Sequence, residues 1–326
     1  MAMLASDFSR PDQHRGPLGT AIYWMVFWLL IYPLSRILML FHWWPPYPSL
    51  DKPRAHFGDY QPGASDVLVC SYFKSGTTWL LQIVTQIAWK GRAEFDSMFS
   101  VAPWPDGPPV MRSMLIPLSN PSPAQLSPTG LRAIKTHLNA GLVPWRAEAR
   151  YIAMTRDPKA VAVSGYHFFK AAAFGPSMPP FWNWVAQFTT RRFFIGSWAV
   201  HLSSYWSRRD EPNVLFLNYE ELRGNPAQGI DRIAAFMGVT LTEEARAAVI
   251  ERSSFAAMKQ QESKFEPPTL YPWAVPEGAM VRKGGSGGRD PLMTPEYARR
   301  IDDFSRAELQ SLGCDFDYDE AYTKVQ

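Results

Sequence analysis

Residues 67–79 read VLVCSYFKSGTTW. The run from Asp66 to Ser71 is short and apolar, which predicts a buried β-strand at 67–70. A polar loop rich in serine, threonine and glycine follows, and a helix is expected from Trp79 to about Trp89. A strand that passes through a tight polar loop straight into a helix is typical of an α/β fold, so this stretch decides the fold class.

Strands and helices alternate along the rest of the chain. Strands are expected at 131–135, 150–155 and 214–217, helices after Asp157-Pro158, across the aromatic-rich region 181–205 and at 226–237, 242–251 and 254–261, a long loop at 103–128, and a polar C-terminal tail that contains Cys314. This alternation predicts a single α/β domain with a central, mainly parallel β-sheet flanked by helices.

Composition narrows the class of protein. Of the 326 residues, 46% are hydrophobic and 19% are charged, which is ordinary for a globular protein and excludes disorder as the main state. The net charge of +3 gives no argument for a nucleic-acid partner, and none is expected. Two cysteines, Cys70 and Cys314, are too few for a disulfide framework, so a reducing, cytoplasmic compartment is favoured. No spacing of histidines and cysteines predicts a zinc site.

The N-terminal segment is unusually apolar. Residues 16–35 carry no charge, and the apolar character resumes after Arg36. The length suffices to span a bilayer, although Pro33 and Arg36 interrupt the run. We expect residues 19–48 to associate with a membrane, preferably as a monotopic helix or broken hairpin lying in one leaflet.

The division of the chain follows from this segment. Residues 1–18 are expected to be an N-terminal tail, 19–48 the membrane-associating segment and 49–326 the α/β domain. A spanning anchor and an apolar arm packed on the domain or on a partner remain alternatives, and a homodimer is compatible with the sequence. A signal peptide is disfavoured because the run is long and lacks a small-residue cleavage pattern.

The loop after the first strand has the chemistry of an anion site. A helix that begins there presents backbone N–H groups and the positive end of its dipole to a ligand. Gly76 lets the backbone approach a phosphate closely, Thr77 and Thr78 add hydroxyl donors, and Lys74 adds a charge. The motif is not Walker A, in which lysine follows the last glycine.

Seven segments, in order, resemble the motifs of the cytosolic-type sulfotransferase family. They are YFKSGTTW at 72–79, KTHL at 135–138, RDP at 156–158 with Ser164 beyond it, GSWxxH at 196–201, VLFLxYE at 214–220, ERSSFAAM at 251–258 and RKG at 282–284. The ordered set covers roughly residues 50–312, and the N-terminal apolar segment lies outside it. Each segment alone is weak, but their shared order makes coincidence very improbable.

The resemblance implies an enzyme that moves the sulfuryl group of 3′-phosphoadenosine 5′-phosphosulfate (PAPS) to a hydroxyl or amine acceptor, releases PAP and needs no metal. His137 would be the general base, and Lys74 and Lys135 would neutralise charge on the transferring group. Lys135 and His137 are two residues apart at a strand end, so their side chains point to one face.

The nucleotide-binding residues implied by the resemblance fall in several segments. The list comprises Lys74, Ser75, Gly76, Thr77 and Thr78 for the 5′ group, Arg156, Ser164, Arg282, Lys283 and Gly284 for the 3′-phosphate, and Trp79, Phe255, Tyr219 and Ser253 for adenine. Two departures from the family pattern stand out. Phe73 replaces the usual proline of the first loop, and the glycine-rich 282–289 lacks the usual acidic and tryptophan positions. This predicts a mobile segment, with either weaker nucleotide binding or ordering of the segment only on binding.

The acceptor is expected to be hydrophobic. An aromatic wall would be built from Phe168, Phe169, Phe174, Phe181 and Trp182, with Trp104 from the proline-rich stretch. An aromatic pocket with one polar centre suits a hydrophobic alcohol or phenol. Together with the apolar N-terminal segment it suggests a lipid-like acceptor, and a soluble phenol is the alternative.

Three other functions compete. A membrane-tethered, inactive sulfotransferase-like binding protein would explain the altered 282–289 segment, but the chain retains Lys74, Lys135 and His137. A P-loop nucleotide phosphotransferase is disfavoured by the position of the lysine and by the lack of an evident acidic residue for Mg²⁺. A luminal Golgi enzyme is disfavoured by the scarcity of cysteine.

Overall fold

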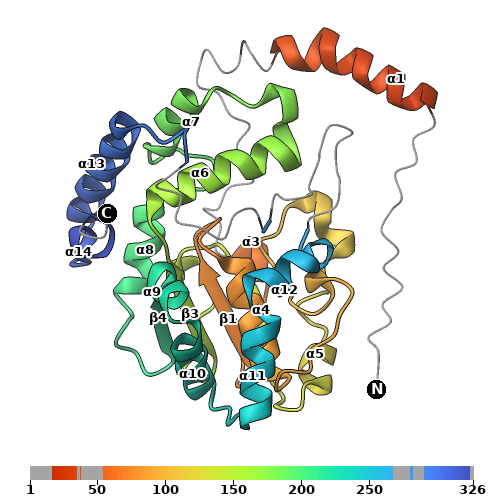
Figure 1. Ribbon diagram of the computed structural model, residues 1–326, viewed down its shortest axis with the longest axis vertical. Helices are drawn as coiled ribbons and strands as arrows, with labels where there is room; N and C mark the ends of the chain where they lie inside the picture. The colour runs from red at the N-terminus through yellow and green to blue at the C-terminus, as the bar shows by residue number, and fades with distance from the viewer. Residues whose placement is uncertain (1–16, 35–36, 38–53, 267–279, 282–289, 324–326) are drawn as a thin grey trace.

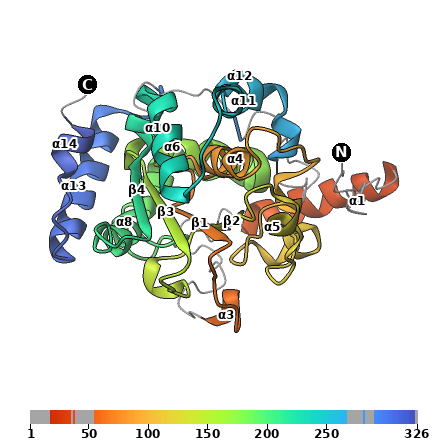
Figure 2. The ribbon, with the colours of Figure 1, turned by 90° about the horizontal axis from the view of Figure 1, so that it is seen from below.

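The computed structural model describes residues 17–34, 37, 54–266, 280–281 and 290–323. Its centre is one sheet of four parallel strands, β1 (Asp66–Ser71), β2 (Arg132–Thr136), β3 (Arg150–Thr155) and β4 (Val214–Asn218). Their order is β2-β1-β3-β4, so β1 is an inner strand and β2 forms one edge (Figures 1 and 2). The four predicted strands and the parallel sheet are thus confirmed.

Helices lie on both sides of this sheet. They are α1 (Pro17–Val26), α3 (Arg54–Phe57), α4 (Thr77–Ala88), α5 (Ser122–Leu126), α6 (Pro158–Phe169), α7 (Phe181–Phe188), α8 (Trp198–Trp206), α9 (Tyr219–Gly224), α10 (Pro226–Met237), α11 (Glu243–Arg252), α12 (Phe255–Gln260), α13 (Pro295–Ser311) and α14 (Tyr318–Tyr322). Figure 2 shows α4 and α10 on one side of the strands and α3 on the other.

Short helical turns complete the chain. Two are π-helical, η1 (Phe27–Ile31) and η5 (Lys170–Phe174), and the others are 3₁₀ turns, η2 (Met98–Ser100), η3 (Pro109–Met114), η4 (Ala140–Leu142), η6 (Gly175–Ser177) and η7 (Glu262–Lys264). The predicted long loop at 103–128 therefore contains only η3 and the five-residue α5.

Alternating side chains of β1 build the core on both faces of the sheet. Val67 and Val69 pack with α4, α10 and α11, whereas Leu68 and Cys70 pack on the opposite face with Tyr205 of α8. All four β1 side chains are fully buried. Burial on both faces explains why the strand is continuously apolar, as strands of parallel sheets are.

Helix-capping residues in the sequence set several element ends. The Asp157 carboxylate accepts a hydrogen bond from the Lys159 N–H at the start of α6, with Pro158 at the first helical position. Gly238, with φ of 71°, ends α10 in the left-handed conformation. The predicted helix start after Asp157-Pro158 and the predicted helix end at residue 237 are confirmed.

Two predicted regions differ from the structure. The expected helical region 181–205 is split into α7 and α8, because Gly196 takes a positive φ of 83° and Ser197 then caps the new helix. The supposed polar C-terminal tail contains the 17-residue α13 and the shorter α14. These helices pack their apolar side chains, including Ile301 and Leu309, against α6, α7 and α8.

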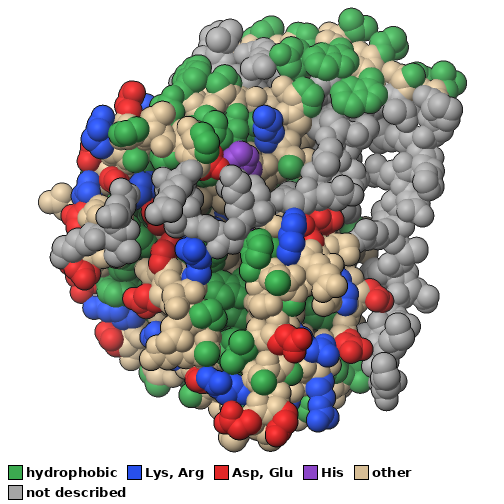
Figure 3. Space-filling view, viewed as in Figure 1, with side chains coloured by type: hydrophobic (Ala, Val, Ile, Leu, Met, Phe, Trp, Pro, Cys, Tyr) green, Lys and Arg blue, Asp and Glu red, His purple; other side chains and the backbone are tan. Residues whose placement is uncertain are grey.

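The N-terminal apolar segment is helical where it is described. α1 continues into η1, and large apolar side chains of this segment are exposed (Figure 3), namely Leu18, Ile22, Met25, Val26, Trp28, Leu29, Leu30 and Leu34. Among the described residues, no helix has both the length and the apolar character needed to cross a membrane. The rest of the predicted segment, apart from Ile37, lies outside the described residues.

A buried ion cluster ties α6 to α13. The Lys159 side chain is buried, and its Nζ lies 2.6 Å from Asp302 Oδ1 and 3.2 Å from Asp157 Oδ1. Tyr318 of α14 donates a further hydrogen bond to Asp302. Since Asp157 also begins α6, this cluster fixes the helix that follows β3.

Substitution Asp302→Asn should therefore destabilise the fold. It leaves the buried Lys159 ammonium with only Asp157 as a counter-charge, and we expect the free energy of unfolding to fall by about 2 to 3 kcal/mol. Urea denaturation measures this change. The matched control Asp231→Asn removes the exposed ion pair with Arg246 and should change stability much less. Equal losses in both variants would contradict the account.

Candidate active site

The turn between β1 and α4 lies at the carboxyl edge of the sheet. The Ser75 N–H donates to Tyr72 O over 3.1 Å, and Lys74 takes a positive φ of 58°, which is uncommon for a residue with a side chain. Gly76 follows with φ of 91°. A Cβ at Gly76 would lie 2.6 Å from the Tyr219 ring, so only glycine fits here.

This turn leaves the amino end of α4 open to an anion. The helix has no side-chain cap and no acidic residue in its first turn, so its first N–H groups and positive dipole end remain available. The buried Ser75 hydroxyl has no hydrogen-bond partner among the described residues. The Thr77 hydroxyl bonds the Ser71 hydroxyl at 2.6 Å, whereas Thr78 is partly exposed beside it.

Arg156 joins the β3 end to this turn. Its Nη1 donates to Lys74 O over 2.9 Å, and its guanidinium carbon lies 4.3 Å from the centre of the Tyr219 ring. The side chain is nearly buried, so its charge stands at the edge of the anion site. Ser164 lies partly buried on α6, in the helix that Arg156 precedes.

Three of the four predicted adenine residues, Trp79, Tyr219 and Ser253, are in contact. The Trp79 indole packs edge-on against Tyr219 at 5.6 Å and donates its N–H to Ser253 O over 2.8 Å. The buried Ser253 hydroxyl has no partner within the described part of the chain, and Phe255 is 47% exposed. This group therefore offers ring faces and one polar edge beside the turn. The predicted Arg282, Lys283 and Gly284 lie outside the described residues.

His137 follows the end of β2, next to β1. Its Nδ1 lies 2.7 Å from Ser71 O, and since a carbonyl only accepts, Nδ1 carries the hydrogen and Nε2 is left as the basic nitrogen. Burial, and then the positive charge of Lys135, lower the pKa of His137 well below its ordinary value. The ring is therefore neutral near physiological pH.

Lys135 is a buried cation beside His137. Its Nζ lies 3.2 Å from the centre of the Trp104 ring, which also packs edge-on against His137. Burial lowers the pKa of Lys135 to about 7; Asp106 opposes this shift and the positive charge of Lys74 adds to it. An open helix end, two lysines and a neutral imidazole can bind an anionic group and accept a proton from its attacker.

An aromatic cluster lies next to the turn. Phe168 contacts Lys74 Nζ at 4.4 Å, and Phe169 packs against both Phe168 and Phe174. Phe73 joins the same cluster through Phe169, and a Cβ at Gly165 would lie 2.7 Å from its ring. Phe73 therefore serves as part of the wall as well as of the turn.

Not every predicted wall residue faces this cluster. Trp182 is 54% exposed on α7, whereas Trp184, two residues later, is fully buried and contacts Phe169. Phe181 is buried against Tyr166 and Tyr297. The sequence reasoning missed Trp184, Phe193 and Phe194, although their aromatic spacing in the same region was a signal.

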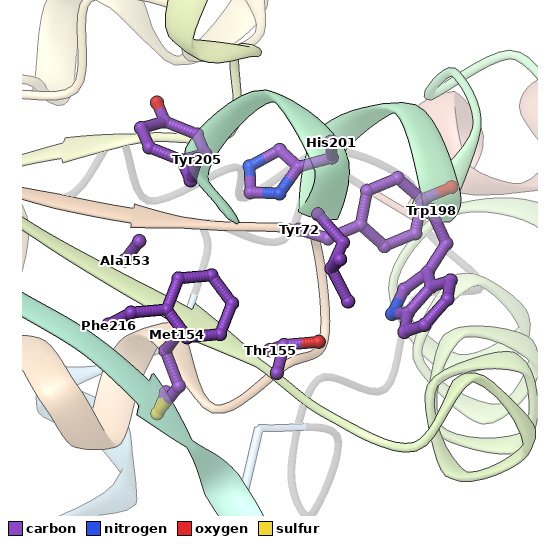
Figure 4. A pocket seen from close by; sticks show the side chains of 9 residues that line it. Tyr72, Ala153, Met154, Thr155, Trp198, His201, Tyr205 and Phe216 are labelled. Atoms are coloured by element: carbon purple, nitrogen blue, oxygen red, sulfur yellow. The ribbon is translucent and has the colours of Figure 1, made fainter. Parts of the chain in front are cut away.

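A small cavity of about 10 Å³, enough for one water molecule, lies beyond the β1 end. Figure 4 shows the His201 ring between Tyr72 and Tyr205 at this cavity. Its Nε2 has no hydrogen-bond partner in the described chain, and burial lowers its pKa to about 3. His201 is therefore a second neutral histidine near the site. In the sequence its only signal is its position as the last residue of the GSWxxH segment.

Comparisons with known proteins agree with this arrangement. A family model described as the sulfotransferase domain matches residues 64–313. Sulfotransferase 1B1 of Mus musculus is 35% identical over 210 residues, which cover 62% of this chain and 68% of the relative. Sulfotransferase 1B1 of Canis lupus familiaris is 28% identical over 295 residues, covering 87% and 96% respectively.

A solved structure shares the fold. It is retinol dehydratase in complex with androsterone and the inactive cofactor PAP, which superposes with a TM-score of 0.63 at 23% identity. The match covers 84% of this chain and 88% of that chain. At this level of identity the likeness shows the arrangement of strands and helices.

The protonation state of His137 can be tested directly. Long-range ¹H–¹⁵N NMR should show the neutral ring with the hydrogen on Nδ1 at pH 6.5, because burial and Lys135 disfavour the imidazolium. In denaturing urea the same residue should titrate near its ordinary pKa of about 6.5. A doubly protonated ring in the folded protein at pH 6.5 would contradict the electrostatic description.

Proposed function

This chain belongs to the sulfotransferase family, and from that premise we propose that it transfers the sulfuryl group of PAPS to a hydroxyl or amine of a hydrophobic acceptor. One observation carries the proposal. The uncapped end of α4, with Lys74 and Arg156 beside it, adjoins Lys135 and His137 at the end of the neighbouring strand β2. An anion bound at the end of α4 would present its reactive end to Lys135 and His137.

The donor fits the chemistry of the turn. The 5′-phosphosulfate would be bound by the N–H groups at 76–78, by the hydroxyls at 75, 77 and 78 and by Lys74, and the 3′-phosphate by Arg156 and Ser164. Adenine would contact Trp79 and the residues around it. The support lies in unpaired donors, since the Ser75 and Ser253 hydroxyls have no partners among the described residues. Retinol dehydratase, which shares the fold, was solved with PAP.

The proposed step is an in-line displacement. The acceptor oxygen attacks sulfur, the bond between sulfur and the bridging phosphate oxygen breaks, and PAP leaves. Nε2 of His137 takes the proton of the acceptor hydroxyl. Lys74 and Lys135 stabilise the negative charge that develops on the transferring group and on the departing phosphate.

The charges at the site favour binding of the donor before His137 accepts the proton. The two lysines lower the pKa of His137 in the protein without a ligand. A bound anion would offset that positive charge, so the imidazole becomes a stronger base once the donor is in place. Burial of Lys135 disfavours its cation, and the same anion restores it.

The aromatic cluster supports a hydrophobic acceptor. Phe168 lies against Lys74 and packs on Phe169, which contacts Phe73, and Trp104 lies against His137, so apolar ring surface adjoins both groups. A steroid, androsterone, is bound in the complex of retinol dehydratase, whose fold is shared. We therefore place a hydrophobic alcohol, such as a sterol or another lipid-like alcohol, first among the acceptors to be tested.

Transfer of ³⁵S from PAPS by the purified protein tests the proposal. With a panel of phenols, sterols and lipid alcohols, we expect labelled product from the wild type and a loss of at least about 100-fold in His137→Ala, since a general base contributes about 10²- to 10⁴-fold. His56→Ala, which changes a histidine on the separate α3, is the matched control and should retain activity. Unchanged transfer by His137→Ala would contradict the assigned base.

We propose that the protein acts at the cytoplasmic surface of a membrane. Both cysteines are free thiols, which suits a reducing compartment. α1 and the η1 turn that continues it, whose large apolar side chains are exposed, lie on the side of the molecule toward which β1 points (Figure 1). Insertion of these side chains into one leaflet would bring the site close to a lipid acceptor.

Sedimentation with phosphatidylcholine vesicles tests this contact. The double variant Leu29→Glu/Leu30→Glu should reduce partitioning at least about tenfold, since each buried leucine contributes about 1.5 to 3 kcal/mol. Leu126→Glu, at another exposed leucine on α5, should have no effect. Equal sedimentation of the double variant, or none of the wild type, would contradict the proposal.

A further inference from the structure

The outer edge of β2 is closed by a turn from the proline-rich stretch. β2 is an edge strand, so the N–H groups of Lys135 and His137 point away from β1. The Lys135 N–H donates to Pro103 O over 2.8 Å, and the His137 N–H donates to Asp106 Oδ2 over 2.8 Å. The Asp106 side chain thus takes the place of a neighbouring strand at the catalytic end.

The turn that carries Asp106 is itself tightly fixed. Gly107 donates its N–H to Trp104 O over 3.0 Å, and a Cβ at Gly107 would lie 2.7 Å from a Leu115 methyl group. The same turn places the Trp104 ring over Lys135 Nζ. This single turn therefore places an aromatic face on Lys135 Nζ and a carboxylate on the backbone N–H of His137.

Asp106 supplies the negative charge next to this cluster of cations and histidines. Its side chain is 2% exposed, and burial raises its pKa, whereas the bonds from His137 N–H and Thr136 and the charge of Lys135 lower it. Other charged or titratable groups also act on Asp106, Lys135 and His137. They are Lys74 from the β1–α4 turn, Cys70 from β1, and His201 and Tyr205 from α8.

We infer that Asp106 is a positioning residue, whose carboxylate fixes the backbone of His137 and keeps the buried Lys135 side chain in its ammonium form. The hydrogen bonds that Asp106 accepts favour the carboxylate, and the carboxylate favours the cation beside it. Without it, Lys135 would face only burial and the positive charge of Lys74, which both favour the neutral amine.

Asp106→Asn is the test variant, because asparagine still accepts the His137 N–H but carries no charge. Titration of ¹³C-lysine by NMR, with Lys135 assigned through Lys135→Arg, should show the pKa of Lys135 falling by at least about one unit, as loss of a close counter-charge predicts. The cation is then lost at lower pH than in the wild type. An unchanged pKa would overturn the inference.

Asp66→Asn is the matched control. Asp66 is a buried acid that pairs with Arg132 at the opposite end of the same strand β2, with 2.8 Å between Nε and Oδ1. This variant should lower the melting temperature but leave the titration of Lys135 unchanged. An equal shift in both variants would mean that loosening of β2, rather than the Asp106 charge, controls Lys135.

The functional consequence rests on the proposed sulfuryl transfer. The pH profile of kcat/KM for PAPS reports the ionisations of the free enzyme. The decline of this profile at high pH should move to lower pH in Asp106→Asn, by the same shift that NMR measures. A wild type without transferase activity would refute the proposed function, and the lysine titration would still decide the role of Asp106. A lower pKa of Lys135 without a shift in the high-pH decline of kcat/KM would overturn the catalytic part of the inference.

Should Asp106→Asn fail to fold, the reciprocal variant Lys135→Gln replaces it. Two interacting charges affect each other equally, so removal of the Lys135 cation should raise the pKa of the Asp106 carboxyl, read from its ¹³C resonance. An unchanged Asp106 titration would overturn the inference.

Discussion

The sharp turn between β1 and α4 is the constraint on which the rest of the site depends. Its two positive φ angles, at Lys74 and Gly76 on either side of Ser75, turn the chain so that α4 begins without a side-chain cap. The absence of a Cβ at Gly76 admits the Tyr219 ring, which in turn packs beneath Arg156. One backbone conformation thus positions groups from β1, β3 and β4.

Several positively charged side chains lie at this edge of the sheet. Lys74 and Lys135 each lower the pKa of His137, and Lys74 lowers that of Lys135. Such mutual repulsion destabilises the protein without a ligand, and a polyanionic nucleotide would relieve it. We therefore expect the site to be electrostatically complementary to an anionic donor, as pre-organised transfer requires.

Local sequence patterns predicted most of the elements that carry the site. The apolar run of β1, the Asp157 cap and the Gly238 stop act within a few residues, so their structural meaning could be derived without tertiary contacts. α13 was missed because its sequence is strongly polar and its few apolar side chains, such as Ile301, become meaningful only against α6 and α8.

Side-chain environment was harder to predict than element position. Trp182 and Trp184 are both aromatic, and only packing distinguishes the exposed one from the buried one. Asp106 lies in a proline-rich loop without periodicity, about 30 residues before the strand whose edge it closes, and no local pattern marks it. The N-terminal membrane contact is still a prediction.

A crystal structure of the protein with PAP would test the central claim most directly. We expect the 5′-phosphate of PAP at the amino end of α4, within hydrogen-bond distance of the N–H groups at 76–78, with the 3′-phosphate at Arg156 and Ser164. PAP bound elsewhere, or no binding by calorimetry at millimolar concentration, would contradict the assignment of this turn as the donor site.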